Sequence, residues 1–200
     1  MKRVLLIFSI VLALCLFIAG QTTAAELGLK LGSSTITFKD STGQTTDVDF
    51  DYVAALYLDF VDVNQYTKTG LGPSFEIAYA SKSLGDELCI DQNNNLTYCD
   101  EDFTYTGFEV NLKAVYGSDF RIFAYGGIST NRLAIDITPQ TTGQSYSFVE
   151  EYYWGFQGAA GAQYVFMNNF AVGAEYKYKV YSDNEVDHQQ FVTINFGFHF

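Results

Sequence analysis

The sequence is poor in residues that would point to a nucleic-acid-binding or helix-rich protein. Its 200 residues include only two prolines, one tryptophan and three cysteines, and 11 basic residues stand against 23 acidic ones. The formal net charge of −12 argues against nucleic acid as a partner, because such binding neutralises phosphates with basic side chains. Tyrosine and phenylalanine are abundant, with 15 and 18 copies, and this balance favours many strands and few helices.

A leader segment precedes the expected folded domain. Lys2 and Arg3 are followed by an apolar run from Val4 to Ala19 and by small and polar residues up to Ala25. The run is shorter than the roughly 20 residues of a membrane-spanning helix, so the pattern predicts a secretory signal peptide over residues 1–25. Residues 26–200 are then expected to form a single domain.

The end of the chain alternates between apolar and polar residues. Because side chains alternate across a strand, one face of this segment suits lipid and the other a polar interior, which is typical of a transmembrane β-barrel strand. Seven earlier segments repeat the pattern, and in the first of them a bulge near Ser33 and Ser34 would explain why Ile36 and Phe38 change parity. The apolar set of the last strand is Val192, Ile194, Phe196, Phe198 and Phe200, and the earlier segments cover about 27–38, 50–61, 71–79, 103–116, 120–130, 151–166 and 170–179.

These eight segments predict an all-β fold, an eight-stranded antiparallel up-and-down transmembrane β-barrel. Transmembrane barrels have short periplasmic turns and longer extracellular loops, so the short connections are assigned to the periplasm and the long ones to the cell exterior. Short or medium connections are expected at about 62–70, 117–119 and 167–169, and long ones at about 39–49, 81–102, 131–150 and 182–187.

The chain resembles the small outer-membrane β-barrel family that includes the OmpA transmembrane domain and OmpX. The resemblance rests on the leader, the stretch from Trp154 to Tyr164, the strand Glu175-Tyr176-Lys177-Tyr178 and the terminal Phe200. It implies a place in a Gram-negative outer membrane and insertion by the barrel assembly machinery, which in this family reads the final aromatic strand, here Phe196, Phe198 and Phe200. It does not imply a peptidoglycan-binding domain.

The polar parity of the strands carries many charges. Eight strands enclose an interior that side chains just fill, so a wide pore is not expected. Buried charges of both signs would pair, and we expect a structural ion-pair network, with a narrow or gated ion path as the alternative. The expected lumen charges are Asp59, Glu76, Glu109, Lys113, Arg121, Glu175, Lys177 and Lys179, together with Asn111, Gln157 and Gln163.

Cys89 and Cys99 are the two cysteines that follow the leader. In an exported protein they are expected to form a disulfide, and the alternative of a metal thiolate site is weak because no histidine or further cysteine lies nearby. No metal, cofactor or catalytic residue is assigned. His188 lies near Ser182 and several acids, but no nucleophile elbow accompanies it.

The predicted function is a structural or surface-interaction role, such as adhesion or envelope integrity, without enzymatic activity. The expected partners are outer-membrane lipid and lipopolysaccharide, the assembly machinery, and a host or envelope protein reached through the exterior loops, whose acids could also hold divalent cations. The barrel is expected to be a monomer. Two alternatives stay open: a narrow porin-like channel, and a soluble barrel resembling lipocalins, in which the apolar parity would face inward around a lipid.

Overall fold

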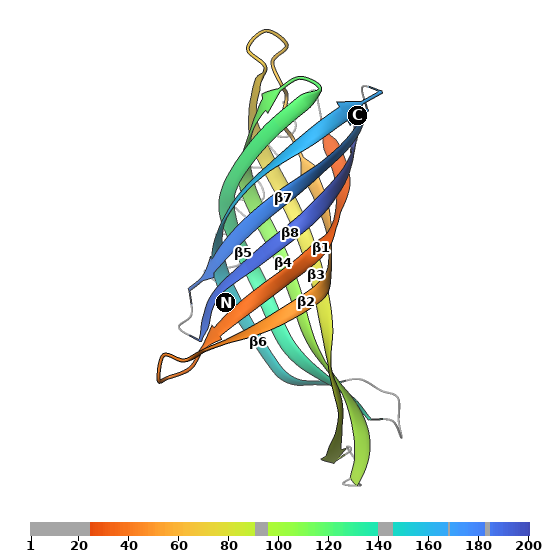
Figure 1. Cartoon of the computed structure of the whole chain (residues 1–200), viewed down its shortest axis with the longest axis vertical. Coiled ribbons are helices and arrows are strands. Elements are labelled where there is room, and N and C mark those ends of the chain that lie inside the picture. The colour runs from red at the N-terminus through yellow and green to blue at the C-terminus, as the bar shows by residue number, and fades with distance from the viewer. Residues whose placement is uncertain (1–24, 91–95, 140–145, 168, 183–184) are drawn as a thin grey trace, which may run out of the picture.

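The computed structural model describes residues 25–200 except 91–95, 140–145, 168 and 183–184, and it leaves out the side chains of 86–90, 96–97, 139 and 146–149. Eight strands form a closed antiparallel barrel in which each strand pairs with its neighbours in sequence and β8 pairs with β1 (Figure 1). No helix in these residues is long and apolar enough to cross a membrane. The strands are β1 (Glu26–Lys39), β2 (Thr45–Asp59), β3 (Thr69–Ile90), β4 (Leu96–Gly117), β5 (Phe120–Pro139), β6 (Tyr146–Phe166), β7 (Phe170–Tyr181) and β8 (Val186–His199).

The last predicted strand closes the barrel against the first. Leu29 lies opposite Phe196 and Leu31 opposite Ile194 in the β1–β8 pairing. Beyond the strands, Ala25 and Phe200 exchange backbone hydrogen bonds of 3.1 and 2.9 Å. The predicted eight-stranded up-and-down barrel is confirmed, whereas the predicted leader falls almost wholly outside the described residues and stays a prediction.

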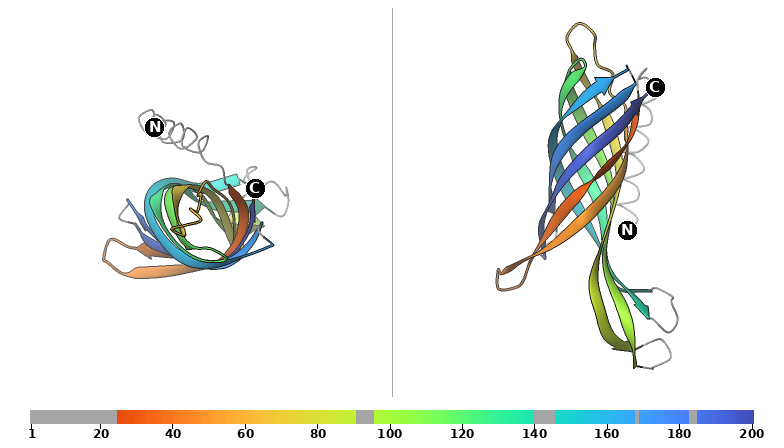
Figure 2. Two further views of the ribbon diagram at one scale, coloured as in Figure 1. Left: turned by 90° about the horizontal axis from the view of Figure 1, so that it is seen from above. Right: turned by 45° about the vertical axis from the view of Figure 1, so that its right-hand side comes forward.

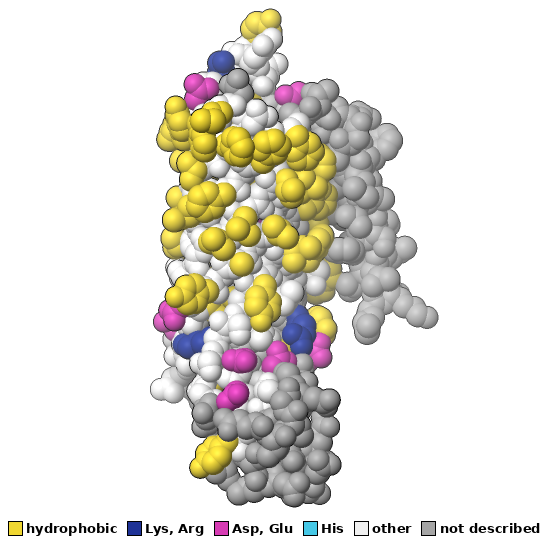
Figure 3. Space-filling view, turned by 90° about the vertical axis from the view of Figure 1, so that its right-hand side faces the viewer, with side chains coloured by type: hydrophobic (Ala, Val, Ile, Leu, Met, Phe, Trp, Pro, Cys, Tyr) yellow, Lys and Arg dark blue, Asp and Glu magenta, His cyan; other side chains and the backbone are white. Residues whose placement is uncertain are grey.

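The apolar parity of the strands faces outward. Leu56 is 60% exposed, Phe156 63% and Ile194 53%, although all three are hydrophobic. Figure 3 shows such side chains as a broad band across the face of the barrel in view, with acidic and basic side chains beyond both ends of the band. A soluble barrel that holds lipid inside, the alternative left open by the sequence, is wrong because it needs the opposite arrangement of faces.

Four strands are longer than the hydrophobic pattern predicts. β3 and β4 have 22 residues each, β5 has 20 and β6 has 21. Most of the predicted exterior loops 81–102 and 131–150 are therefore strand, and the β1–β2 connection shrinks to residues 40–44. Outside lipid the outer face no longer needs apolar side chains, so the alternation fades while the backbone pairing continues.

A bulge interrupts the β1–β2 pairing at the predicted place but on the other strand. Gly32 pairs with Val53 and Ser34 with Phe50, so two residues of β2 oppose the single Ser33. β1 keeps its phase, and Ile36 is completely buried in the lumen. The expectation that Ile36 and Phe38 join the lipid-facing set is wrong, since the parity change belongs to β2.

Candidate functional site

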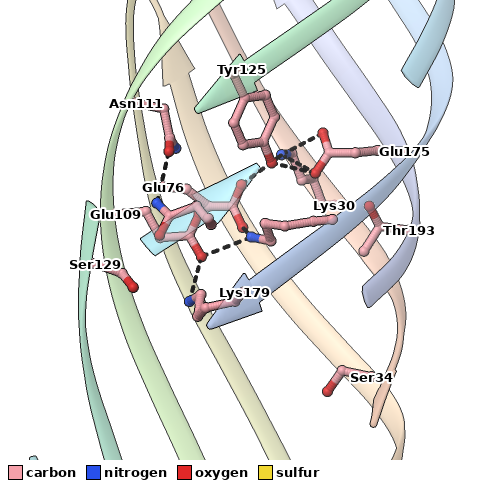
Figure 4. A network of polar contacts seen from close by, with 12 residues as sticks. Lys30, Ser34, Glu76, Glu109, Asn111, Tyr125, Ser129, Glu175, Lys179 and Thr193 are labelled. Carbon is pink, nitrogen blue, oxygen red and sulfur yellow. Dashed lines mark hydrogen bonds and ion pairs between the residues drawn. The ribbon is translucent and has the colours of Figure 1, made fainter. Parts of the chain in front are cut away.

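A network of ion pairs fills the middle of the lumen, and Lys30 of β1 is its first centre. The Lys30 Nζ lies 2.6 Å from Glu76 Oε2 of β3 and 2.8 Å from Glu175 Oε2 of β7. The same ammonium donates to the Tyr125 hydroxyl at 3.2 Å, and that hydroxyl donates to Glu175 Oε1 at 2.5 Å. Figure 4 shows these side chains converging from different walls of the barrel. Lys30 thus joins two carboxylates from opposite sides of the lumen.

Two further lysines extend the network toward the end with the long hairpins. Lys177 lies 2.5 Å from Glu76 Oε1 and 2.8 Å from Glu109 Oε1, and Lys179 lies 2.9 Å from the same Glu109 oxygen. Lys179 also donates to the Tyr105 hydroxyl at 2.7 Å. Each buried cation has at least one carboxylate partner, which offsets the desolvation of both. We call Lys30, Glu76, Glu109, Glu175, Lys177 and Lys179 the central network.

A second set of charges lies at the end with the short turns. Lys113 Nζ is 2.5 Å from Asp59 Oδ2, and His199 Nε2 is 3.0 Å from Glu26 Oε2. The Tyr57 hydroxyl donates to Glu26 at 2.5 Å, and Arg121 approaches His199 at 3.4 Å. These residues close the lumen at this end, and we call Glu26, Asp59, Lys113, Arg121 and His199 the end cluster.

The eight charges predicted for the lumen all lie on its inner face. Seven of them are buried, and Arg121 is half-buried at the rim beside Glu26 and Lys113. Two lumen charges were missed in the sequence, Glu26 and Lys30. Lys30 stands between Leu29 and Leu31, so the alternation of its strand already predicted an inward side chain. Glu26 is the first residue of its strand, where the alternation has only just begun, and its direction was harder to predict.

With these two included, the described lumen charges balance. Five cations face five acids, and the ammonium groups also lie against aromatic rings, with Lys113 Nζ 4.2 Å from the Phe123 ring centre. A lumen without net charge needs no counter-ion within the barrel. The cations are Lys30, Lys113, Arg121, Lys177 and Lys179, and the acids are Glu26, Asp59, Glu76, Glu109 and Glu175.

The half of the lumen nearer the long hairpins is apolar, which the sequence reading did not predict. Phe50 and Phe103 stack with ring centres 5.4 Å apart, and Phe191 is tilted against Tyr105 at 5.9 Å. This layer covers the central network and separates it from that end of the barrel. We call it the apolar cap, and its buried members are Ile36, Phe50, Val53, Ala55, Ala78, Ala80, Phe103, Tyr105, Leu133, Tyr153, Tyr181, Val186 and Phe191.

Four strands rise from the cap as a protruding sheet of residues 81–90, 96–104, 131–139 and 146–154, which shares Phe103, Leu133 and Tyr153 with the cap (Figures 1 and 2). β2 pairs with β3 only as far as Val53 and Ala80, while β3 stays paired with β4 up to Ile90. β6 similarly pairs with β7 only from Gly155 onward. In the described pairing the sheet therefore has two open edges, one on β3 and one on β6.

A cluster of polar side chains lies on the outer surface of this sheet. Arg132 Nε lies 2.9 Å from Glu150 Oε1, and the Tyr152 hydroxyl donates to the same oxygen at 2.5 Å. The Tyr152 hydroxyl and the Arg132 guanidinium hold the pKa of the exposed Glu150 carboxyl below its usual range. Glu150 is therefore ionised at neutral pH and paired along the outside of the sheet.

The two cysteines lie on neighbouring strands, and the two histidines contact acidic or aromatic side chains. Cys99 is buried and pairs with Glu87, while Cys89 pairs with Thr97, so the cysteines lie two positions apart on neighbouring strands. The Cys89 side chain lies outside the description, and the disulfide stays a prediction. His188 stacks on Tyr178 at 5.2 Å and contacts Asp187 at 2.9 Å. No group of three metal-ligating side chains was found among the described residues.

Comparisons with known proteins agree on the fold. The family model for the outer membrane protein beta-barrel domain matches residues 9–200. The structure of Ail, the attachment invasion locus protein of Yersinia pestis, in complex with the heparin analogue sucrose octasulfate, superimposes with a TM-score of 0.53 at 17% identity, over 88% of this chain and 99% of that one. Neisserial surface protein A gives 0.48 at 12% identity, over 88% and 97%. No curated protein sequence matches the chain.

Proposed function

The chain belongs to the outer membrane protein beta-barrel domain family and lies in the bacterial outer membrane, and from this premise we propose that it is a non-enzymatic scaffold that presents the protruding sheet to a partner protein outside the cell. The long hairpins face the exterior and the short turns the periplasm, following the general asymmetry of such barrels. Adhesion is the surface role that this arrangement fits best.

The observation that carries the proposal is the open edge of β3 beyond Ala80. β2 leaves the sheet there, and ten residues of β3 continue with β4 as the one strand neighbour given by the pairing. An open edge offers backbone donors and acceptors to an incoming strand, a recurring mode of protein recognition. An extended segment of a host or envelope protein can add to the sheet in this way.

The filled lumen supports a scaffold role rather than transport. An ion path would have to cross both the apolar cap and the ion pairs of Lys30, Lys177 and Lys179, whose side chains are at most 5% exposed. Breaking such buried pairs is costly, because it leaves unpaired charges in the lumen. The network instead ties the strands below the protruding sheet into a rigid base.

Several further features belong to the same proposal. Residues 1–25 act as an export leader in a Gram-negative cell, and the assembly machinery recognises the final strand through Phe196, Phe198 and Phe200. Outward exposure of these rings, 65% for Phe200, leaves them accessible while the last strand awaits insertion. Outer-membrane lipid and lipopolysaccharide surround the folded barrel, which works as a monomer.

Shortening the protruding sheet tests the proposal. Residues 84–101 are replaced by Asn-Gly, which joins Ser83 to Asp102, a pair that already lies in register. Cells displaying this variant should adhere to epithelial monolayers and to matrix protein no better than cells without the protein. The matched control replaces the β1–β2 hairpin 40–44 with the same turn and should adhere like wild type.

Heat-modifiable gel mobility must show that both variants are folded and present in the outer membrane in equal amounts. Adhesion that survives the loss of residues 84–101 would refute the role of the sheet. The non-enzymatic part is tested separately by assaying lipid A deacylation and palmitoyl transfer on the wild type. Turnover that is lost in His188→Ala would show that the barrel is an enzyme.

A further inference from the structure

A cavity of about 370 Å³ opens above the apolar cap at the exterior mouth of the barrel. Its walls come from several strands, with Phe38 of β1, Val48 of β2, Phe103 of β4 and Leu133 of β5 among the lining residues. Phe103 and Leu133 also belong to the apolar cap, so the floor of the cavity is continuous with the buried core. The volume lies within the range of small-molecule sites, about 300–1,000 Å³.

The walls of this cavity are held by paired strands. Phe103 packs between the rings of Phe50, at 5.4 Å, and Phe38, at 5.8 Å with an angle of 61° between the ring planes. Leu133 is 4% exposed and pairs with Tyr105 across the β4–β5 ladder. The apolar wall of the cavity is therefore held by paired strands, while Glu185 comes from the connection between β7 and β8.

Two carboxylates supply the charge of the site. Among the described residues that line the cavity, Glu151 of β6 and Glu185 before β8 are the charged ones. The Tyr153 hydroxyl donates to Glu151, which fixes this carboxylate above the apolar wall. The mouth thus attracts cations and repels anions.

We propose that this mouth cavity binds a small amphipathic organic cation, with its aromatic or aliphatic body against Phe38, Phe103 and Leu133 and its protonated amine at Glu151 and Glu185. Burial of the apolar body supplies affinity, and charge-assisted hydrogen bonds from the ammonium to the carboxylates supply selectivity. The site adjoins the open β3 edge through Leu84, while its two carboxylates come from β6 and from the connection before β8.

Three indole probes of similar size and different charge test the proposal. The full barrel, isotope-labelled at leucine and valine methyl groups, is held in lipid nanodiscs and titrated with tryptamine, tryptophol and indole-3-propionate. Tryptamine should shift the methyl resonances of Leu133 and Val48 in a saturable way. Tryptophol should bind about tenfold more weakly and the anionic probe more weakly still. Each ion pair between the ammonium and one of the two carboxylates raises the affinity for the cation by a few-fold.

Variants separate the charge from the cavity. Glu151→Gln with Glu185→Gln should weaken tryptamine about tenfold and leave tryptophol unchanged. Glu150→Gln is the matched control, because Glu150 is the sequence neighbour that pairs with Arg132 on the outer surface, and it should bind like wild type. Leu84→Trp, which adds volume to the lining, should abolish the shifts by all three probes.

Two results would overturn the proposal. Equal affinity for tryptamine and indole-3-propionate would remove the role of the carboxylates. Shifts confined to the lipid-facing methyl groups of Leu56 and Leu112 would show that the probes enter the membrane and not the mouth.

Discussion

Replacing Lys30 with methionine probes the central network at its most connected point. Lys30 Nζ lies 2.6 Å from Glu76 and 2.8 Å from Glu175, and its side chain is only 5% exposed. Glu76 keeps a second cation in the variant, because Lys177 lies 2.5 Å from its other oxygen. Glu175 has Lys30 as its one ion-pair partner among the described residues, and it would keep only the hydroxyl of Tyr125 and a long contact with Asn195.

The expected loss follows from this difference between the two carboxylates. Removing one member of a buried ion pair destabilises a protein by about 3–5 kcal/mol, because the remaining charge is buried without compensation. Since Tyr125 still donates to Glu175, we expect the lower part of that range, about 3 kcal/mol. Adding Glu175→Gln to Lys30→Met removes the orphaned charge and should restore more than half of the loss.

Urea unfolding from lipid vesicles measures the effect. Trp154 is the sole tryptophan of the chain and lies on the outward parity of β6 at the base of the protruding sheet, so its fluorescence reports the loss of barrel structure when the protein unfolds. Lys39→Met is the matched control, because Lys39 is exposed at the exterior end of β1, and it should change the free energy of unfolding by less than about 0.5 kcal/mol. If the free energies of unfolding of Lys30→Met and Lys39→Met agree within about 1 kcal/mol, the structural role of the network is refuted.

Three further predictions concern other parts of the barrel. Wild-type protein in a planar lipid bilayer should give no conductance steps, because the cap and the network fill the lumen, and stable channel openings would contradict this. Phe200→Ala should lower the amount of heat-modifiable barrel in outer-membrane fractions while the protein refolded in vitro remains stable; wild-type amounts would argue against an assembly signal. Processed, oxidised protein should react with maleimide only after reduction, and rapid labelling that is lost in Cys99→Ser would rule out the disulfide between Cys89 and Cys99.

The sequence predicts the membrane-embedded part of the fold well, because contact with lipid produces a pattern that can be recognised within each single strand. Each outward residue must be apolar, so alternation in Val192 to Phe200 or in Phe170 to Lys179 identifies both the strand and its faces. Above the membrane, outward residues no longer need to be apolar. In residues 131–139 the charged Arg132 and Asp136 share one parity and the buried Leu133 and Ile137 share the other, and the reading assigned this segment to a loop although the backbone ladder continues.

The sequence predicts which charged residues face the lumen but not which of them form ion pairs. Alternation indicates that Glu76, Lys177 and Lys30 face inward, yet which acid meets which base depends on strand stagger and on the distance across the barrel. The apolar cap was missed for a related reason. Ile36 and Phe50 are apolar in segments where apolar side chains were expected to face lipid, and only the phase of β1 and the bulge in β2 turn them inward.

The ion pairs of the central network also set an order on assembly. They join residues far apart in the chain, with 145 positions between Lys30 and Glu175 and 101 between Glu76 and Lys177. A partial barrel of β1 to β6 holds Lys30, Glu76 and Glu109 but lacks the three charges of β7 that complete their pairing. Intermediates that enter the membrane hairpin by hairpin would expose unmatched charge, so insertion and closure are expected to occur as one cooperative event. The ion pairs that make the closed barrel rigid therefore also disfavour partly inserted barrels, in which these charges have no partner.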